Sequence, residues 1–291
     1  MTTQEGDATL DRRRFLLACA LSGGLAGLAR PARARRLERV GLQLYTVRAE
    51  LARDVEGTVA RVAEIGFSEV ELAGHAGRTP AELAAILARH DLTAPSGHTQ
   101  LAGLAEDRLE AELDACAALG HRYLVCAYLA PNQRRTLDQY RAHADLFNRS
   151  GERCRSAGVR LAYHNHDFEL APIAGPNGAT MPLELLLERC DPQLVAFELD
   201  LYWITKGGGD PLSYFARWPG RFELFHVKDM DASEAGSFTE VGAGVIDFER
   251  IFAHAGQAGV RHSFVEQDVV QGDLWQSLRT SYAAARALRA G

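Results

Sequence analysis

The sequence predicts an α/β protein, a single (β/α)8 TIM barrel preceded by a cleavable N-terminal export signal. From Val40 to the C-terminus, short apolar strand-like runs alternate with amphipathic segments of helical period, and the alternation gives eight pairs. Glycine directly follows several of the helical stretches, as it does at helix C-caps. The glycine fingerprint of an open dinucleotide-binding sheet does not follow the first strand, so the closed barrel is favoured over a doubly wound sheet.

Composition and charge exclude several classes of protein. With 291 residues, of which 47% are hydrophobic and 24% charged, the chain is neither disordered nor collagen-like nor a coiled coil. Its formal charge of −6 offers no basic surface for a phosphate backbone, so nucleic acid is not an expected partner. We expect the four cysteines of the body to be buried small residues, with one fortuitous disulfide as the alternative. They are Cys116, Cys126, Cys154 and Cys190.

Residues 1–34 are interpreted as an export signal and residues 35–291 as the barrel. The stretch Asp11–Leu17 resembles the twin-arginine consensus, with Arg12-Arg13, one free position, then Phe and Leu. The apolar run that follows is shorter than the roughly 20 residues of a stable membrane span, and Ala32-Arg33-Ala34 supplies a cleavage site. This predicts the twin-arginine export machinery as a partner and a periplasmic or otherwise exported protein. An amphipathic N-terminal helix or a membrane anchor is the alternative.

Eight strands are expected from apolar runs rich in Val, Leu, Phe and Tyr. They are Val40–Val47, Phe67–Ala73, Leu92–Leu101, Tyr123–Tyr128, Arg160–Asp167, Val195–Trp203, Phe222–Asp231 and His262–Val269. Two irregular segments are expected after strands, a flexible loop at Gly207–Gly209 and an insertion at Leu170–Thr180. At the active-site face of a barrel, an insertion of that kind is a candidate lid.

Eight helices are expected between and after these strands. They are Val55–Ile65, Pro80–His90, Leu104–Leu119, Leu137–Ala157, Leu183–Cys190, Pro211–Trp218, Phe248–Ala258 and Leu274–Leu288. Gly66, Gly120, Gly158 and Gly259 follow helical stretches and are expected as C-caps, and Thr79-Pro80 as an N-cap followed by Pro at the first helical position.

Polar residues follow the apolar runs of four successive strands. The sequence motifs are YHNHD with His164 and His166, FELD with Glu198 and Asp200, FHVKD with His226 and Lys228, and FVEQD with Glu266. In a barrel, the carboxyl ends of all the strands meet at one mouth. Imidazole and carboxylate donors without a thiolate suit Mn²⁺, Co²⁺, Zn²⁺ or Mg²⁺. Because buried charges persist only when they are paired or bind a metal, the pattern predicts a site for one divalent ion.

The chain from Val40 to about Leu288 resembles the xylose isomerase-like TIM barrels, which include sugar isomerases and epimerases, inosose dehydratases and endonuclease IV. The resemblance is strongest in VGLQLYTVR, AYHNHDFEL, ELDLYW, FHVKDMD and FVEQD, and it is closest to an exported branch labelled sugar phosphate isomerase/epimerase. It implies a metal held at the ends of the fifth to eighth strands, with Mn²⁺ as the first expectation and homodimerisation as a further one. The positions that match are His164, Asp200, His226 and Glu266.

One departure from the epimerase pattern concerns the fifth strand. In the epimerase members, the fifth-strand ligand is a Glu that works with the eighth-strand Glu as a proton-transfer pair. Here His164 stands at that position, with Asn165 or His166 as the alternative ligand, and His166 shares the strand face of His164. A two-carboxylate relay is therefore not expected, although metal-assisted enolisation remains available to this donor set.

The remaining polar residues of the strand ends are assigned roles by chemistry. Glu266 is the first candidate for the base that takes a proton from a keto-sugar, Glu169 the second and Glu198 the third. Lys228 is expected as an electrophile toward a developing oxyanion, with an ion pair to Asp229 or Asp231 as the alternative. His98 is a candidate acid or hydroxyl-binding group, with a loop cap as the alternative. The expected substrate-binding set is Gln43, Tyr45, Glu71, His166, Glu198 and Trp203, with Tyr202 as a further aromatic candidate.

These features predict a divalent-metal-dependent sugar isomerase or epimerase that enolises a keto-sugar. A 3-keto-glycoside lyase or hydratase that uses the same enolate chemistry is the first alternative, and a non-catalytic sugar-binding barrel is the second. A nuclease of the endonuclease IV type needs a basic face. Cleavage after residue 34 would remove five Arg and three acidic residues and leave the body at −8, which disfavours that class.

Overall fold

Eight parallel strands close into one barrel in the computed structural model, which describes residues 2, 35–37, 39–176 and 178–291. The strands are β2 (Gly41–Gln43), β3 (Glu69–Leu72), β4 (Thr93–Thr99), β5 (Tyr123–Cys126), β6 (Arg160–His164), β9 (Val195–Asp200), β10 (Phe222–Val227) and β13 (His262–Val265). Their order around the barrel is the order of the chain, and β13 pairs with β2 to close it. All eight predicted strands are present, so the predicted barrel is confirmed. Apart from residue 2, the predicted export signal lies outside the described residues.

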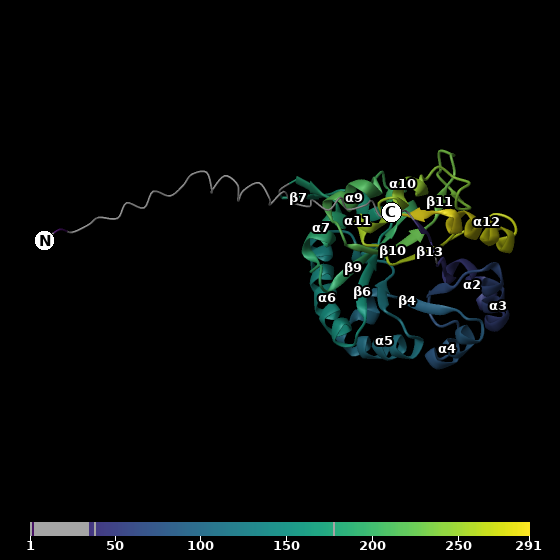
Figure 1. Cartoon of the computed structure of the whole chain (residues 1–291). Coiled ribbons are helices and arrows are strands. Elements are labelled where there is room, and N and C mark those ends of the chain that lie inside the picture. The colour runs from purple at the N-terminus through teal and green to yellow at the C-terminus, as the bar shows by residue number, and fades with distance from the viewer. Residues whose placement is uncertain (1, 3–34, 38, 177) are drawn as a thin grey trace. The chain divides into compact units, whose positions relative to one another are not determined.

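Helices surround the strands on the outside of the barrel, as Figure 1 shows. The longer ones are α3 (Val55–Ile65), α4 (Pro80–Arg89), α5 (Glu106–Leu119), α6 (Leu137–Ser156), α7 (Pro182–Arg189), α9 (Pro211–Arg217) and α12 (Leu274–Ala287). Shorter helical pieces are α2 (Arg48–Leu51), α8 (Leu201–Lys206), α10 (Phe248–Phe252), α11 (Ala255–Ala258), and the 3₁₀ turns η1 (Leu44–Val47), η2 (Leu101–Leu104), η3 (Pro131–Gln133) and η4 (Phe168–Leu170). Three two-stranded ribbons complete the fold: β1 (Arg35–Arg36) with β14 (Arg289–Ala290), β7 (Ile173–Gly175) with β8 (Gly178–Thr180), and β11 (Asp229–Met230) with β12 (Phe238–Thr239).

Helix ends follow the capping residues that the sequence indicates. Thr79 forms a capping box with Glu82 at the start of α4, and Pro80 occupies the first helical position. Gly66 and Gly120 end α3 and α5 in the left-handed region, at φ of 114° and 73°. A side chain there is strained, so glycine stops each helix and turns the chain into the next strand.

An apolar layer of side chains fills the interior of the barrel. It consists of Tyr123, Val125, Ala162, Ala196, Leu224 and Phe264. The ring of Phe264 lies against the backbone of β2, where a Cβ at Gly41 would fall 2.3 Å from its Cδ1 atom. Glycine is therefore required at position 41. The apolar layer fills the barrel interior, so the polar side chains lie above this layer, at the carboxyl ends of the strands.

Several predicted boundaries are wrong. The strand predicted at Val195–Trp203 ends at Asp200, because the Asp200 side chain accepts a hydrogen bond from the Trp203 backbone N–H and starts α8 there. The glycine run at Gly207–Gly209 follows this helix rather than the strand. The irregular insertion expected at Leu170–Thr180 contains the β7–β8 hairpin. The helix predicted at Phe248–Ala258 is divided into α10 and α11.

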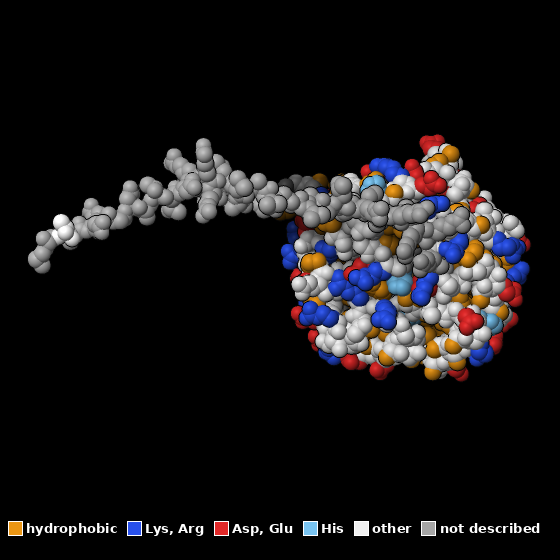
Figure 2. Space-filling view, in the orientation of Figure 1, with side chains coloured by type: hydrophobic (Ala, Val, Ile, Leu, Met, Phe, Trp, Pro, Cys, Tyr) orange, Lys and Arg blue, Asp and Glu red, His pale blue; other side chains and the backbone are white. Residues whose placement is uncertain are grey.

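The four cysteines of the body are buried and unpaired among the described residues, so no fortuitous disulfide forms there. No helix within the described part of the chain is long and apolar enough to cross a membrane. Acidic, basic and apolar side chains are intermingled on the face seen in Figure 2.

A buried carboxylate joins the strands at the end of the barrel opposite the mouth. Glu69, at the start of β3, accepts hydrogen bonds from Arg39 at 3.1 Å and from His262 Nδ1 on β13 at 2.8 Å. Burial raises the pKa of Glu69, but hydrogen bonds and charges from His262 and Arg39 outweigh it and leave the pKa below 4.5. The contacts of Glu69 with Arg39 and His262 therefore stabilise the seam where β13, β2 and β3 close the barrel.

Replacing this carboxylate tests the seam. Because the folded pKa of Glu69 is depressed, its stabilisation is present above about pH 4.5 and is lost as the pH falls through the lower folded value. We expect Glu69→Gln to lower the free energy of unfolding by about 1–3 kcal/mol at neutral pH, and less at pH 3. Urea unfolding between pH 3 and pH 7 measures this, with the exposed Glu64→Gln as the control. An equal loss at every pH would contradict the assignment.

Candidate functional site

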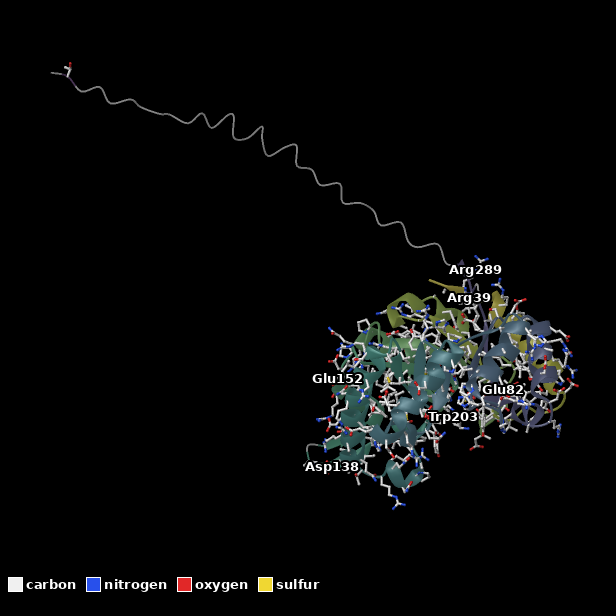
Figure 3. The ribbon with its side chains drawn as sticks, turned by 90° about the horizontal axis from the view of Figure 1, so that it is seen from below. Arg39, Glu82, Asp138, Glu152, Trp203 and Arg289 are labelled. Carbon is white, nitrogen blue, oxygen red and sulfur yellow. The ribbon has the colours of Figure 1, made fainter. Side chains whose placement is uncertain are left out.

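A cavity of about 720 Å³ opens at the carboxyl ends of the strands. Its lining includes His98 from β4, His164 from β6, and Lys228 and Glu266 beyond β10 and β13. Figure 3 shows Arg39, which precedes β2, at one end of the barrel, and Trp203, which follows β9, toward the other. The mouth therefore lies where parallel barrels place their ligands.

The four residues that match the implied metal ligands lie together next to the inner end of this cavity, where His164 and Glu266 belong to the lining and Asp200 and His226 do not. They are His164 on β6, Asp200 on β9, His226 on β10 and Glu266 directly after β13, and all are buried. The sheet register sets His226 beside Asp200. Asp200 Oδ2 is 3.8 Å from His164 Nε2 and 3.8 Å from His226 Nδ1, and His226 Nδ1 is 2.9 Å from Glu266 Oε2.

The atoms in this cluster fit a divalent ion. Asp200 Oδ2 is buried and has no hydrogen-bond partner among the described residues, although two imidazole nitrogens face it. Burial and the neighbouring His226 hold the pKa of His164 well below 6.5, so its imidazole is neutral, the form that ligates metals. Two imidazole nitrogens and two carboxylates form a donor set for Mn²⁺, Co²⁺ or Zn²⁺, and the ion's identity depends on availability and geometry.

Lys228 lies among the same carboxylates. Its Nζ is 3.1 Å from Asp200 Oδ2, 2.7 Å from Glu266 Oε2 and 2.6 Å from Asp268 Oδ2, and the residue is 1% exposed. Burial lowers the pKa of Lys228, but these three carboxylates outweigh it and raise the pKa well above 10.5. Burial raises the pKa of Asp200 to about 6 despite the attraction of Lys228, whereas Lys228 and His226 keep the pKa of Glu266 well below 4.5. The ammonium therefore stays charged and compensates part of the buried negative charge.

A second polar layer lies beneath the donors. His98 Nε2 is 2.9 Å from Glu198 Oε2 and 3.0 Å from Glu71 Oε2, and Gln43 Nε2 donates to Glu71 Oε2 at 2.7 Å. Gln43, Glu71 and Glu198 are fully buried and absent from the cavity lining, so the structure places these predicted substrate-binding residues below the cavity. Burial lowers the pKa of His98, but the charges of Glu71 and Glu198 raise it to about 10.

Aromatic side chains form one wall of the mouth. Trp203 lies with its ring 5.4 Å from the ring of His166 and 5.5 Å from Lys228 Nζ. Trp203 Nε1 and His166 Nδ1 are buried without hydrogen-bond partners among the described residues. Tyr45 is 41% exposed and lines the cavity, whereas Tyr202 is buried and donates its hydroxyl hydrogen to the Gly236 carbonyl. His166 and Tyr45 line the cavity, so a substrate can reach them, whereas Trp203, also predicted to bind substrate, packs against His166 and is absent from the lining.

Glu169, the second candidate base, lies away from the cavity lining. It accepts hydrogen bonds from the Tyr163 hydroxyl and, at 2.8 Å, from the His166 backbone N–H. Burial raises its pKa to about 8 in spite of these bonds. In this position Glu169 fixes the loop that carries His166.

Sequence reasoning missed several residues of the lining. Asp268 follows Glu266 by two positions, so the alternation of the eighth strand could have indicated that it shares the Glu266 face. Arg108 and Glu112 come from α5, one helical turn apart, and no strand-end rule points to them. Tyr128 and His75 also line the cavity.

Comparisons with known proteins agree with the barrel fold. A family model described as xylose isomerase-like TIM barrel matches residues 59–268. An inosose dehydratase of Geobacillus kaustophilus is 25% identical over 232 residues, which cover 67% of this chain and 73% of that protein. For another inosose dehydratase, from Lacticaseibacillus casei, the identity is 27% over 140 residues, and the chain spans about half the length of that relative.

A solved structure gives the most extensive structural match described here. The crystal structure of a sugar phosphate isomerase/epimerase from Parabacteroides distasonis superposes with a TM-score of 0.72 at 26% identity. The match covers 89% of this chain and 96% of that one. The similarity therefore extends over nearly the whole barrel.

Removing the ammonium tests whether Lys228 competes with a metal. Lys228→Met deletes a cation that is 3.1 Å and 2.7 Å from two proposed ligands, so we expect the affinity for Mn²⁺ to rise about tenfold or more. Isothermal titration calorimetry of the metal-free protein measures this. Lys206→Met, at the other lysine of the chain, is the control and should leave the affinity unchanged. Weaker binding in Lys228→Met would mean that the lysine holds Glu266 in place instead.

Proposed function

Because the chain belongs to the xylose isomerase-like TIM barrel family, we propose that it is a divalent-metal-dependent enzyme that enolises a polyhydroxy ketone and then eliminates a β-hydroxyl group as water. The observation that carries this proposal is the convergence of His164, Asp200, His226 and Glu266 around Asp200 Oδ2, which also has the Lys228 ammonium at 3.1 Å, next to the inner end of the cavity. Catalytic metal sites combine such donors with an open side, and the cavity provides that side.

An ion in this site would be held by His164, Asp200, His226 and one oxygen of Glu266, and would supply Lewis acidity toward a ketone oxygen. The chain's own groups handle the protons. Glu266 is ionised and lines the cavity, so it is positioned to take the proton from the carbon next to the ketone. The electron pair of that C–H bond forms the enolate.

Lys228 supports elimination as the next step. As the enolate electrons form the carbon–carbon double bond, the β C–O bond breaks and Lys228 donates a proton to the leaving hydroxyl, which departs as water. Glu266 then holds the abstracted proton, and Lys228 lacks one. Glu266 Oε2 and Lys228 Nζ are 2.7 Å apart, so a direct transfer between them restores both groups. No external oxidant or reductant is needed.

The single carboxylate base favours elimination over epimerisation. An epimerase that reprotonates the opposite face of the same carbon needs a second proton carrier there, and His164 replaces the carboxylate that would serve. The curated relatives named above are dehydratases of an inosose, a cyclic polyhydroxy ketone. Isomerisation or epimerisation is the second candidate, supported by the similarity to the Parabacteroides isomerase/epimerase and by His98 in the cavity lining.

The substrate proposal is an unphosphorylated ketone. The cationic side chains of the lining are Arg108, Lys228 and His98. Lys228 is already surrounded by three carboxylates, and His98 is paired with Glu71 and Glu198. A phosphate dianion would meet net negative charge at the metal end of the cavity. This agrees with the proposed export of the chain, because phosphorylated sugars are cytoplasmic intermediates.

Substrate turnover distinguishes elimination of water from isomerisation or epimerisation. The protein, loaded in turn with Mn²⁺, Co²⁺, Zn²⁺ and Mg²⁺, would be incubated in D₂O with inososes, ketohexoses and 3-keto-glycosides. We expect loss of water by mass spectrometry, with the rate reduced about 10²–10⁴-fold in Glu266→Gln. Glu64→Gln is the matched control. Deuterium uptake without loss of water would favour the epimerase, and the absence of both from every metal-loaded sample would exclude enolisation of these substrates.

The proposed export can be tested separately. We expect the chain expressed in a bacterium with a twin-arginine system to reach the periplasm and to begin after residue 34. The double substitution Arg12→Lys and Arg13→Lys keeps the charge and should abolish export, whereas Arg30→Lys should not. N-terminal mass spectrometry of the periplasmic fraction measures this. An uncleaved chain in the cytoplasm would contradict the signal.

A further inference from the structure

We propose that Glu71, His98 and Glu198 act as positioning residues that fix the orientation of the two ligand imidazoles. The inference rests on the metal centre proposed above, but it concerns side chains beneath the proposed ligands, of which Glu71 and Glu198 do not reach the cavity and His98 does. His164 Nδ1 is 3.0 Å from Glu198 Oε2, and His226 Nε2 is 2.6 Å from Glu71 Oε2. In each ring the other nitrogen faces Asp200 Oδ2. Each ligand imidazole thus has a carboxylate partner behind it.

Such a partner determines which nitrogen is available to a metal. When Nδ1–H of His164 donates to Glu198, the lone pair of His164 lies on Nε2 and points to Asp200. Glu71 accepts the Nε2–H of His226, so Nδ1 is the nitrogen of that ring that faces the proposed ligands Asp200 and Glu266. A carboxylate behind a ligand histidine also raises the basicity of that histidine.

His98 holds the two carboxylates together. Glu71 and Glu198 are both fully buried, and two carboxylates at this depth repel each other strongly. The Nε2–H of His98 lies between them, 3.0 Å from Glu71 Oε2 and 2.9 Å from Glu198 Oε2. Gln43 and Ser96 add hydrogen bonds to Glu71 from β2 and β4. Four strands therefore contribute to one buried polar layer.

A second metal ion in this lower layer is the competing interpretation. Nitrogens of His98, His164 and His226 and an oxygen of Glu198 lie within 4.8 Å of one another. All three nitrogens, however, converge on the single atom Glu198 Oε2 at 2.9, 3.0 and 3.2 Å, which are hydrogen-bond lengths. Glu198 Oε1 has no hydrogen-bond partner in the part of the chain that the structure describes, but Oε2 already occupies the point that an ion would take. Asp200 Oδ2 faces the upper set of proposed ligands, of which His164 and Glu266 line the cavity.

Metal binding by matched variants tests the assignment. Wild type should bind about one Mn²⁺ per chain, and Asp200→Asn, a direct-ligand variant, should lose most of that affinity. Glu198→Gln and Glu71→Gln should keep one ion per chain with the Kd raised about 10–100-fold. Glu69→Gln is the control, because it changes a buried carboxylate on the same strand as Glu71 at the opposite end of the barrel. Elemental analysis gives the stoichiometry and titration calorimetry the Kd.

A second readout needs no metal. Long-range ¹H–¹⁵N spectra of the metal-free protein report which nitrogen of His164 carries the proton. We expect the Nδ1–H form in wild type and in Glu69→Gln, and a mixture of both forms in Glu198→Gln. If Glu198→Gln does not fold, Ser96→Ala removes only one hydrogen bond to Glu71 and should still raise the Kd for Mn²⁺ measurably.

The outcomes separate this inference from the proposed function. Two ions per wild-type chain, with one lost in Glu198→Gln, would make the lower layer a metal site and overturn the positioning role. An unchanged Kd together with an unchanged His164 tautomer would also overturn it. If wild type binds no metal, the proposed function fails, whereas the His164 tautomer in Glu198→Gln still decides whether Glu198 orients the ring.

Discussion

The structure depends on the compensation of negative charge inside the barrel, because the strands bury several carboxylates there. Glu71, Glu198, Asp200 and Glu266 lie at adjacent levels of the barrel with 0–6% exposure. A carboxylate that is moved from water into protein costs several kcal/mol unless it is paired. His98, His226 and Lys228 lie at hydrogen-bond distance from these oxygens, and each contacts at least two of the four carboxylates. Negative charge remains in excess, and this makes the site attractive to a divalent cation.

The closed sheet explains why these groups meet. Residues of a barrel strand alternate inward and outward, and the inward side chains of alternate strands stack in layers. The register sets Gln43 beside Glu71 in the lower layer, and the proposed ligand His164 beside Glu198 of that layer. Phe264 fills the barrel below them and the helices cover it outside, so water does not reach the layer from beneath. Polar groups there can be satisfied only by one another.

Strand-end reasoning and the family resemblance predicted the fold and the four proposed ligands, but not the depth of the polar residues. Alternation indicates that Gln43, Glu71 and Glu198 point inward, which is correct. It does not indicate how far each strand runs before the mouth, because that depends on the stagger of neighbouring strands. Glu198 precedes Asp200 by two residues and therefore lies one layer lower. The same limit explains α8, where the apolar run after Asp200 reads as strand although the Asp200 side chain caps a helix.

Asp200 has two roles: it caps a helix and it is one of the proposed metal ligands. Its Oδ1 accepts from the Trp203 N–H at 2.8 Å, and its backbone N–H donates to Asn165 at 3.0 Å. These bonds end β9, start α8 and bring Trp203 over Lys228, while Oδ2 is left facing the two imidazoles. The carboxylate is fixed by the helix that it caps. Its Oδ2 atom therefore needs no rearrangement to act as a ligand. Lys228 supplies a positive charge beside that oxygen in the metal-free chain, so the barrel can fold with its donors already in place.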